Sequence, residues 1–121
     1  MTLNEIKEIL QAKVLTCDSD MSIEVEGSCS ADLMSDVLAF STPGSLLITG
    51  LVNDVVIRTA EVATIKAIVF VRGKKPKRET VALAERKNIF LLATNLSMFE
   101  ACGKLYEKGL RCSVDMGKMK V

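Results

Sequence analysis

Short apolar runs alternate with helical patterns along this chain. Three such runs, at residues 45–49, 67–71 and 89–93, contain no charged residue, and each is followed by a polar loop and then by apolar residues at helical spacing. This order is typical of parallel strands joined by crossover helices. Strands that are apolar along their whole length are covered on both faces. The pattern therefore predicts an α/β fold with a mainly parallel sheet.

The amino-terminal part of the chain predicts a helix and two further strands. Residues 2–5 form a capping-box sequence that begins a first helix, and residues 13–17 are expected to form a short strand. After a turn at residues 18–20, apolar and polar residues alternate over residues 22–27. This alternation is typical of a strand with one exposed face.

Four more helices are expected, each preceded by a residue suited to a helix start. The polar cluster at residues 28–30 is interpreted as part of the capping of the second helix, because Ser and Asp side chains accept hydrogen bonds from free helix N–H groups. Proline is tolerated in a first turn. The expected starts are Ser30 or Asp32, Asn53 or Asp54, Pro76 in the first turn, and Thr94 or Asn95.

The buried faces of these helices follow from the spacing of their apolar residues. The third helix has few polar positions, so we expect it to be nearly buried, either under the sheet or at a subunit contact. Gly109 is expected to end the last helix. The predicted inner faces are Leu33, Val37 and Phe40 in the second helix, and Leu96, Phe99, Cys102, Gly103 and Tyr106 in the last.

Composition limits the possible classes of protein. With 121 residues, of which 49% are hydrophobic, the chain can form one domain with its own core. A net charge of +1 argues against general binding to nucleic acid or to a membrane surface. The apolar runs are too short to span a bilayer. The amino terminus lacks the features of a signal peptide, so we expect a cytoplasmic protein.

The usual catalytic and metal-binding patterns are missing from the sequence. There is no histidine, no glycine-rich loop ending in Lys-Ser or Lys-Thr, no nucleophile elbow and no dinucleotide fingerprint. The four cysteines include no close pair of the kind that zinc sites need. They are interpreted as buried thiols in a reducing compartment. We therefore expect no enzyme activity, no catalytic residue, no metal and no cofactor.

The loops that follow the three apolar strands form the candidate ligand site. In a parallel sheet these loops lie side by side, and each leads to a helix N-terminus, which favours an anion. Residues 72–78 add five cations, although a basic turn can also serve only to keep a protein soluble. The candidate residues are Thr49, Gly50, Asn53, Arg72, Gly73, Lys74, Lys75, Thr94, Asn95 and Ser97.

The chain also resembles a known family, the DRTGG domains, and is similar to the amino-terminal domain of HPr kinase/phosphorylase. The family is named after an Asp-Arg pair and a Thr-Gly-Gly sequence. In this chain Val52 and Asn53 stand near the place of the Asp-Arg pair, and only Gly73 matches the Thr-Gly-Gly sequence. The segments that carry the resemblance are residues 6–10 with 13–16, Gly27 with residues 31–36, residues 43–49, Gly73 with Pro76, and residues 94–100.

The resemblance implies a single three-layer α/β/α domain that pairs with itself and has a regulatory or interaction role. We expect this domain at residues 1–112, followed by a tail at residues 113–121. Residues 110–121 are expected to form an edge strand or a loose end. Solitary members of the family resemble accessory proteins of redox enzymes. The leading hypothesis is thus a non-catalytic homodimeric module, accessory to a metabolic or redox enzyme. The alternative is a sensor of an adenine nucleotide or another phosphorylated metabolite, with no nucleic acid or membrane partner.

Overall fold

The computed structural model describes residues 1–17 and 20–113. Part of the predicted turn at residues 18–20, and residues 114–121 of the predicted tail, lie outside this range. The elements are α1 (Leu3–Leu10), β1 (Lys13–Val14), β2 (Ser28–Ser30), α2 (Met34–Phe40), β3 (Leu46–Thr49), α3 (Asp54–Ala63), β4 (Ala67–Phe70), α4 (Arg78–Arg86), β5 (Phe90–Ala93) and α5 (Met98–Glu107).

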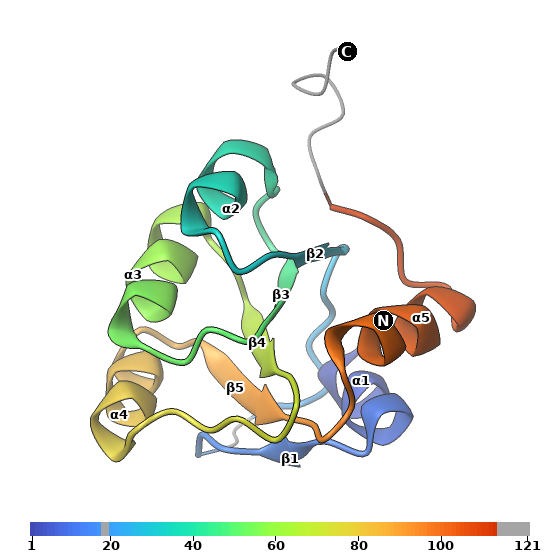
Figure 1. Cartoon of the computed structure of the whole chain (residues 1–121), viewed down its shortest axis with the longest axis horizontal. Helices are drawn as coiled ribbons and strands as arrows, with labels where there is room; N and C mark the ends of the chain where they lie inside the picture. Colours follow the sequence, from blue (N-terminus) through green and yellow to red (C-terminus); the bar gives the residue numbers. More distant parts are fainter. Residues whose placement is uncertain (18–19, 114–121) are drawn as a thin grey trace.

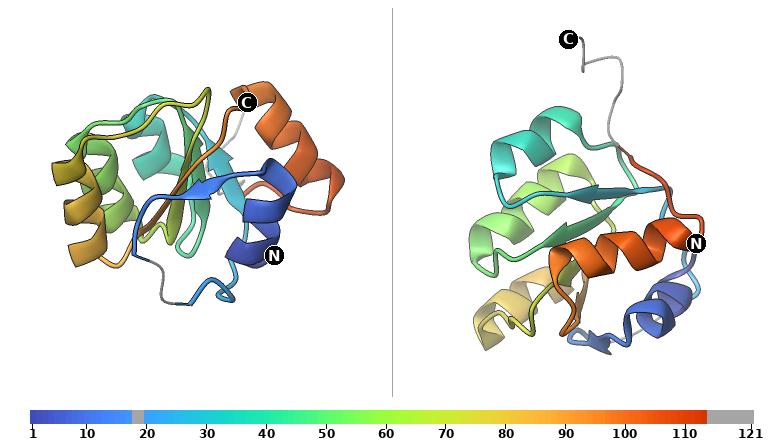
Figure 2. Two further views of the ribbon diagram at one scale, coloured as in Figure 1. Left: turned by 90° about the horizontal axis from the view of Figure 1, so that it is seen from below. Right: turned by 45° about the vertical axis from the view of Figure 1, so that its right-hand side comes forward.

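The strands form one sheet in the order β1-β5-β4-β3-β2 (Figure 1). Strands β2 to β5 are parallel, and β1 is antiparallel to β5. Each parallel strand lies next to the strand that precedes it, and crossovers of one hand therefore place α2, α3 and α4 on the same face. The other face is covered by α1 and α5 (Figure 2). The predicted three-layer α/β/α fold is confirmed.

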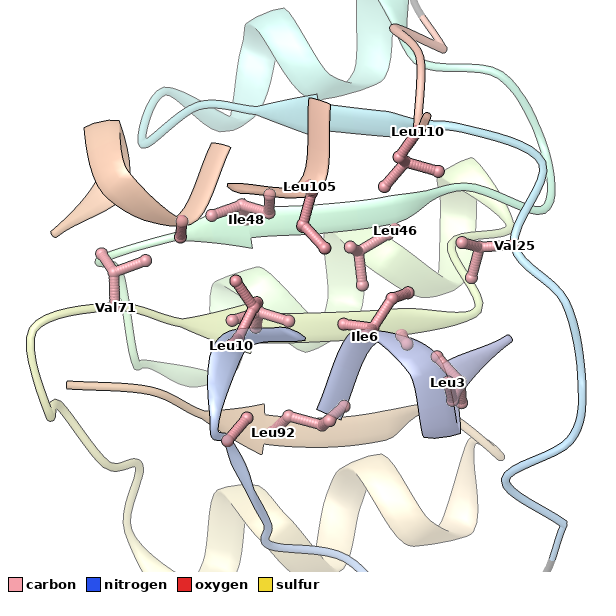
Figure 3. Close-up of a cluster of buried hydrophobic side chains, with 14 of the residues drawn as sticks. Leu3, Ile6, Leu10, Val25, Leu46, Ile48, Val71, Leu92, Leu105 and Leu110 are labelled. Carbon is pink, nitrogen blue, oxygen red and sulfur yellow. The ribbon is translucent and has the colours of Figure 1, made fainter. Parts of the chain in front are cut away.

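The core consists of two layers of apolar side chains, one on each side of the sheet. Successive side chains of a strand point to opposite faces, so Leu46 and Ile48 of β3 face α1 and α5, whereas Leu47 faces the other three helices. Figure 3 shows the first layer, in which Ile6 and Leu10 of α1 pack over the sheet. The capping box of α1 is confirmed, with hydrogen bonds of 2.9 and 3.1 Å between Thr2 and Glu5.

The strand predicted at residues 22–27 is wrong. This segment runs beside the start of α1, where the backbone N–H of Leu3 donates to Ile23 and that of Val25 donates to Met1. The sheet strand begins one residue later, at Ser28, and pairs with β3. The polar residues of β2 were interpreted as helix capping, and this interpretation is also wrong. Alternation alone does not distinguish a strand from an extended segment that packs on a helix.

The helix starts are correct for α3 and wrong for three others. Asn53 caps α3 by accepting a hydrogen bond of 3.1 Å from the backbone N–H of Val55. The N-cap of α2 is Leu33 rather than Ser30 or Asp32, and that of α4 is Lys77, so Pro76 precedes the helix. In α5 the N-cap is Ser97, which accepts from the N–H of Glu100.

The face of α5 that was predicted to be buried lies mostly toward solvent. Phe99 and Tyr106 are 88% and 62% exposed, whereas Ala101 and Leu105 are buried. The sequence of α5 has apolar residues on two faces, and contact with α1 and β3 selects the second one. Gly109 lies directly after the C-cap with φ +109°, which agrees with its predicted place at the helix end.

Two other helices also expose apolar side chains, of which Leu33 was predicted on an inner face. Val55 and Val62 of α3 are 54% and 74% exposed, so this helix is only half covered by the domain. At the start of α2, Leu33 is 62% exposed while Met34 and Val37 are buried. Both α2 and α3 therefore carry more apolar side chains than their contacts within the domain cover.

Candidate functional site

The carboxyl ends of β3, β4 and β5 meet at one edge of the sheet, as expected from their parallel pairing (Figure 1). The chain leaves β4 toward α4 on one face and leaves β5 toward α5 on the opposite face. Ligands of open α/β sheets bind at such a change of direction, beyond the carboxyl ends of the strands. The loops after β4 and β5 are thus the place in this fold where a crevice is expected.

A tight turn after β4 closes most of this crevice. Arg72 and Gly73 have φ values of 59° and 68°, and the N–H of Lys74 donates to Val71 over 3.2 Å. Two consecutive left-handed residues are typical of a type I′ turn. The N–H groups of Arg72 and Gly73 donate over 2.8 Å to the carbonyls of Leu96 and Thr94. These two bonds fasten the turn to the β5–α5 loop.

Gly73 is required at this turn for two reasons. Its left-handed backbone conformation disfavours residues that have a Cβ atom. In addition, a Cβ at this position would lie 2.9 Å from Oδ1 of Asn95, which is closer than real contacts allow. Gly73 and Asn95, both candidate site residues, therefore lie close together, and the bonds from the N–H groups of Arg72 and Gly73 hold the loop after β4 against the loop after β5.

At the end of β3, the carboxylate of Asp32 lies where an anionic ligand was expected. Oδ1 of Asp32 accepts a hydrogen bond of 2.8 Å from the Thr49 hydroxyl and another of 2.8 Å from the N–H of Gly50. These bonds lower the pKa of Asp32, and the nearby charge of Lys74 lowers it further. Asp32 was predicted only as a helix cap. Nothing in its local sequence indicates a contact with Thr49 and Gly50, which lie 17 and 18 positions further along the chain.

The other polar candidates also make bonds within the chain. The hydroxyl of Thr94, which is buried, donates over 2.8 Å to the carbonyl of Leu10, while Asn53 and Ser97 cap their helices. Most backbone donors of the three loops therefore already have acceptors. An anion at this edge would be held chiefly by side-chain cations, and not by a cradle of N–H groups such as a phosphate loop provides.

Cationic side chains are the groups at this edge that remain available to a ligand. None of the five forms an ion pair with a carboxylate in the part of the chain that the structure describes. Lys75 borders two hollows, of about 150 and 540 Å³. The smaller one is also lined by Lys13, which the sequence analysis missed because β1 precedes the parallel strands. The five exposed cations are Arg72, Lys74, Lys75, Lys77 and Arg78.

The structure also places the cysteines. All four lie in the described residues and none is in a disulfide. Cys29 is buried, and burial raises the pKa of its thiol, whereas Cys17 and Cys112 are exposed. Within residues 1–17 and 20–113, no group of three or more histidine, cysteine or acidic residues is placed to hold a metal ion. In the same residues, no helix has the length and apolar character needed for a membrane span.

Comparison with known proteins identifies a domain family and a solved structure of similar fold. Residues 5–107 match the model of the DRTGG domain. The fold is similar to the crystal structure of the CBS and DRTGG domains from the regulatory region of Clostridium perfringens pyrophosphatase, complexed with the activator diadenosine tetraphosphate. The TM-score is 0.76 at 18% sequence identity, over 93% of this chain and 48% of that chain. No curated protein matches the chain. Because the family model covers most of its length, the chain belongs to the DRTGG-domain family.

Proposed function

We propose that the chain is a non-catalytic regulatory module that acts as a homodimer in the cytoplasm, accessory to a metabolic or redox enzyme. Exposed apolar side chains on both helical layers carry this proposal. Removal of exposed apolar surface from water favours association, and a second copy always presents the same surfaces. The exposed apolar side chains are Leu33, Leu38, Val55, Val62, Phe99 and Tyr106.

Light scattering on the purified chain tests the homodimer. At micromolar concentration we expect the mass of a dimer, twice 13.2 kDa. A monomer mass over the whole accessible concentration range would count against a homodimer. The accessory role is tested separately by tagging the chain in its own cells. We expect one metabolic or redox enzyme to co-purify with it in a fixed ratio, and the failure of any such enzyme to do so would argue against this role.

A second candidate function is a sensor of an adenine nucleotide or another phosphorylated metabolite. The observation that favours it is the group of exposed cations at the carboxyl ends of the strands, two of which, Lys13 and Lys75, border the hollow of about 150 Å³. This volume suits a phosphate group rather than a whole nucleotide, because ligand pockets usually measure about 300–1,000 Å³. The regulatory region of the similar pyrophosphatase is complexed with diadenosine tetraphosphate, which supports a nucleotide among the first ligands to test.

Thermal unfolding against diadenosine tetraphosphate, ATP, AMP and pyrophosphate tests the sensor. A ligand at a hundred times its Kd adds about 2.7 kcal/mol of stability, which raises the Tm by several degrees. A variant with Arg72→Ser, Lys74→Ser and Lys75→Ser should lose this rise. The matched control, with Arg58→Ser, Arg86→Ser and Lys108→Ser, removes the same charge elsewhere and should keep it. Equal shifts in both variants would place the site elsewhere.

A further inference from the structure

The exposed face of α5 has an unusual composition for a surface helix. Phe99, Gly103 and Tyr106 are spaced four and three residues apart and therefore share one side of the helix. Phe99 is 88% exposed, and no atom lies within 4 Å of the position that a Cβ of Gly103 would take. Cys102 lies next to Gly103 and is half-buried. The aromatic side chains of Phe99 and Tyr106 thus lie on either side of two small residues, Cys102 and Gly103.

An apolar groove continues this face toward the edge of the sheet. The groove has a volume of about 320 Å³ and lies between α5 and β2, which are neighbours in Figure 2. Its lining includes Ile48, Leu105, Leu110 and Tyr106. On its rim, the guanidinium of Arg111 lies 4.3 Å from the centre of the Tyr106 ring. The α5 face and the groove together form one apolar surface.

We propose that this surface binds a second copy of the chain, with the two α5 helices antiparallel around a two-fold axis between residues 102 and 103. The inference rests on the homodimer proposed above and assigns its interface. In this register Phe99 packs against the partner's Tyr106, and Cys102 lies opposite the partner's Gly103. Aromatic pairs of this kind add about 0.5–1.5 kcal/mol beyond their buried area. The small central residues allow the helices to approach to about 8 Å.

One pair of opposite charges beside the apolar face is compatible with the antiparallel orientation. Glu100 lies 2.5 positions from the proposed axis on one side, and Lys104 lies 1.5 positions from it on the other. The two-fold axis therefore places Lys104 within one residue, about 1.5 Å along the helix, of the partner's Glu100. The same pair forms a second time by symmetry.

The exposed face of α3 is a weaker candidate for this interface. Its two exposed valines are separated by Arg58 and Glu61, and Glu61 is already paired with Lys87 over 3.0 Å. A stable interface buries about 800 Å² on each partner, which is more than one helix face supplies. Around α5, the adjoining groove with Leu110 and Arg111 provides additional surface.

A pair of charge substitutions tests the assignment. Phe99→Lys should convert the dimer to a monomer in light scattering, and it should leave the fold intact because Phe99 is mostly exposed. Val62→Lys introduces the same charge on α3 and should leave the dimer unchanged, with circular dichroism verifying both folds. A Phe99→Lys variant that remains dimeric would overturn the α5 interface while the homodimer stands. A monomeric unmodified chain would overturn both.

Cross-linking through Cys102 tests the register independently. In the proposed pair the two Cys102 Cα atoms approach within the range of about 4.4–6.8 Å that a disulfide needs. In a Cys17→Ser, Cys112→Ser background, two equivalents of Cu(II)-phenanthroline should each accept one electron from the two thiols, which lose two protons and form the disulfide. A covalent dimer is then expected on a non-reducing gel, and Cys102→Ser should abolish it. A dimer in solution without this cross-link would overturn the antiparallel register.

Discussion

The carboxylate of Asp32 is bonded to the backbone N–H of Gly50 over 2.8 Å, at the end of the strand where an anionic ligand was expected. The same Oδ1 atom also accepts from the hydroxyl of Thr49. An internal anion thus fills one part of the predicted site, and it joins the segment before α2 to the end of β3. The cations of the neighbouring loop after β4 remain exposed.

Removal of this carboxylate should destabilise the domain. Asp32→Ala leaves Gly50 and Thr49 without their acceptor, and hydrogen bonds to a charged group are worth about 1.5–3 kcal/mol before allowance for exposure. Because the Asp32 side chain is exposed, we expect a loss of about 1 kcal/mol. Urea unfolding measures it. Glu8→Ala, which removes an exposed carboxylate from α1, is the control and should change stability by less than about 0.5 kcal/mol.

The contribution of Asp32 should also depend on pH. Its pKa is lowered in the folded state by the bonds from Gly50 and Thr49, while in the unfolded chain it is close to the ordinary value of about 3.9. The stabilisation is then fully present above the unfolded pKa and is lost as the pH falls through the lower, folded pKa. The stability difference between the unmodified chain and Asp32→Asn should be constant from pH 7 to 5 and should shrink below about pH 4. A difference that grows on acidification would contradict the assigned bonds.

Gly73→Ala should destabilise the domain. The new Cβ would be strained by φ +68° and would also meet Oδ1 of Asn95 at 2.9 Å, so we expect a loss of about 1–3 kcal/mol. Thermal unfolding measures this loss. Asn95→Ala should restore part of the stability of Gly73→Ala, because it removes the atom that the new Cβ meets, and no recovery would argue against the steric contact.

The cysteines should differ in reactivity. Cys29 is 6% exposed and its thiol has a raised pKa, and since the thiolate is the reactive form, it should be alkylated slowly. Iodoacetamide at pH 8 followed by mass spectrometry should show Cys17 modified first, because it is exposed and lies outside the groove assigned to the interface. In denaturant all four should react at similar rates. Rapid modification of Cys29 in the folded chain would show that β2 opens readily from the sheet.

The proximity of the three loops was predicted from the sequence, but their hydrogen bonds were not. The rule for parallel strands correctly brought the loops after β3, β4 and β5 together, because it depends only on the order of strands and helices. The hydrogen bonds that occupy these loops join residues far apart in the chain. Gly73 bonds to Thr94, and Asp32 bonds to Gly50. Such partners depend on how the loops pack, which local sequence does not specify.

The sequence by itself determined the strands β3, β4 and β5 and the cap of α3, since each depends on local apolar patterns or on one neighbouring side chain, whereas the three-layer architecture was implied by the family resemblance. Only the tertiary structure decided which face of α5 is buried. Met98, Ala101 and Leu105 compete there with Phe99, Cys102 and Tyr106, and both sets have helical spacing. Packing on α1 and β3 selects the first set, because one small sheet can cover only one side of a helix. The second set remains exposed to solvent, where another copy of the chain can cover it.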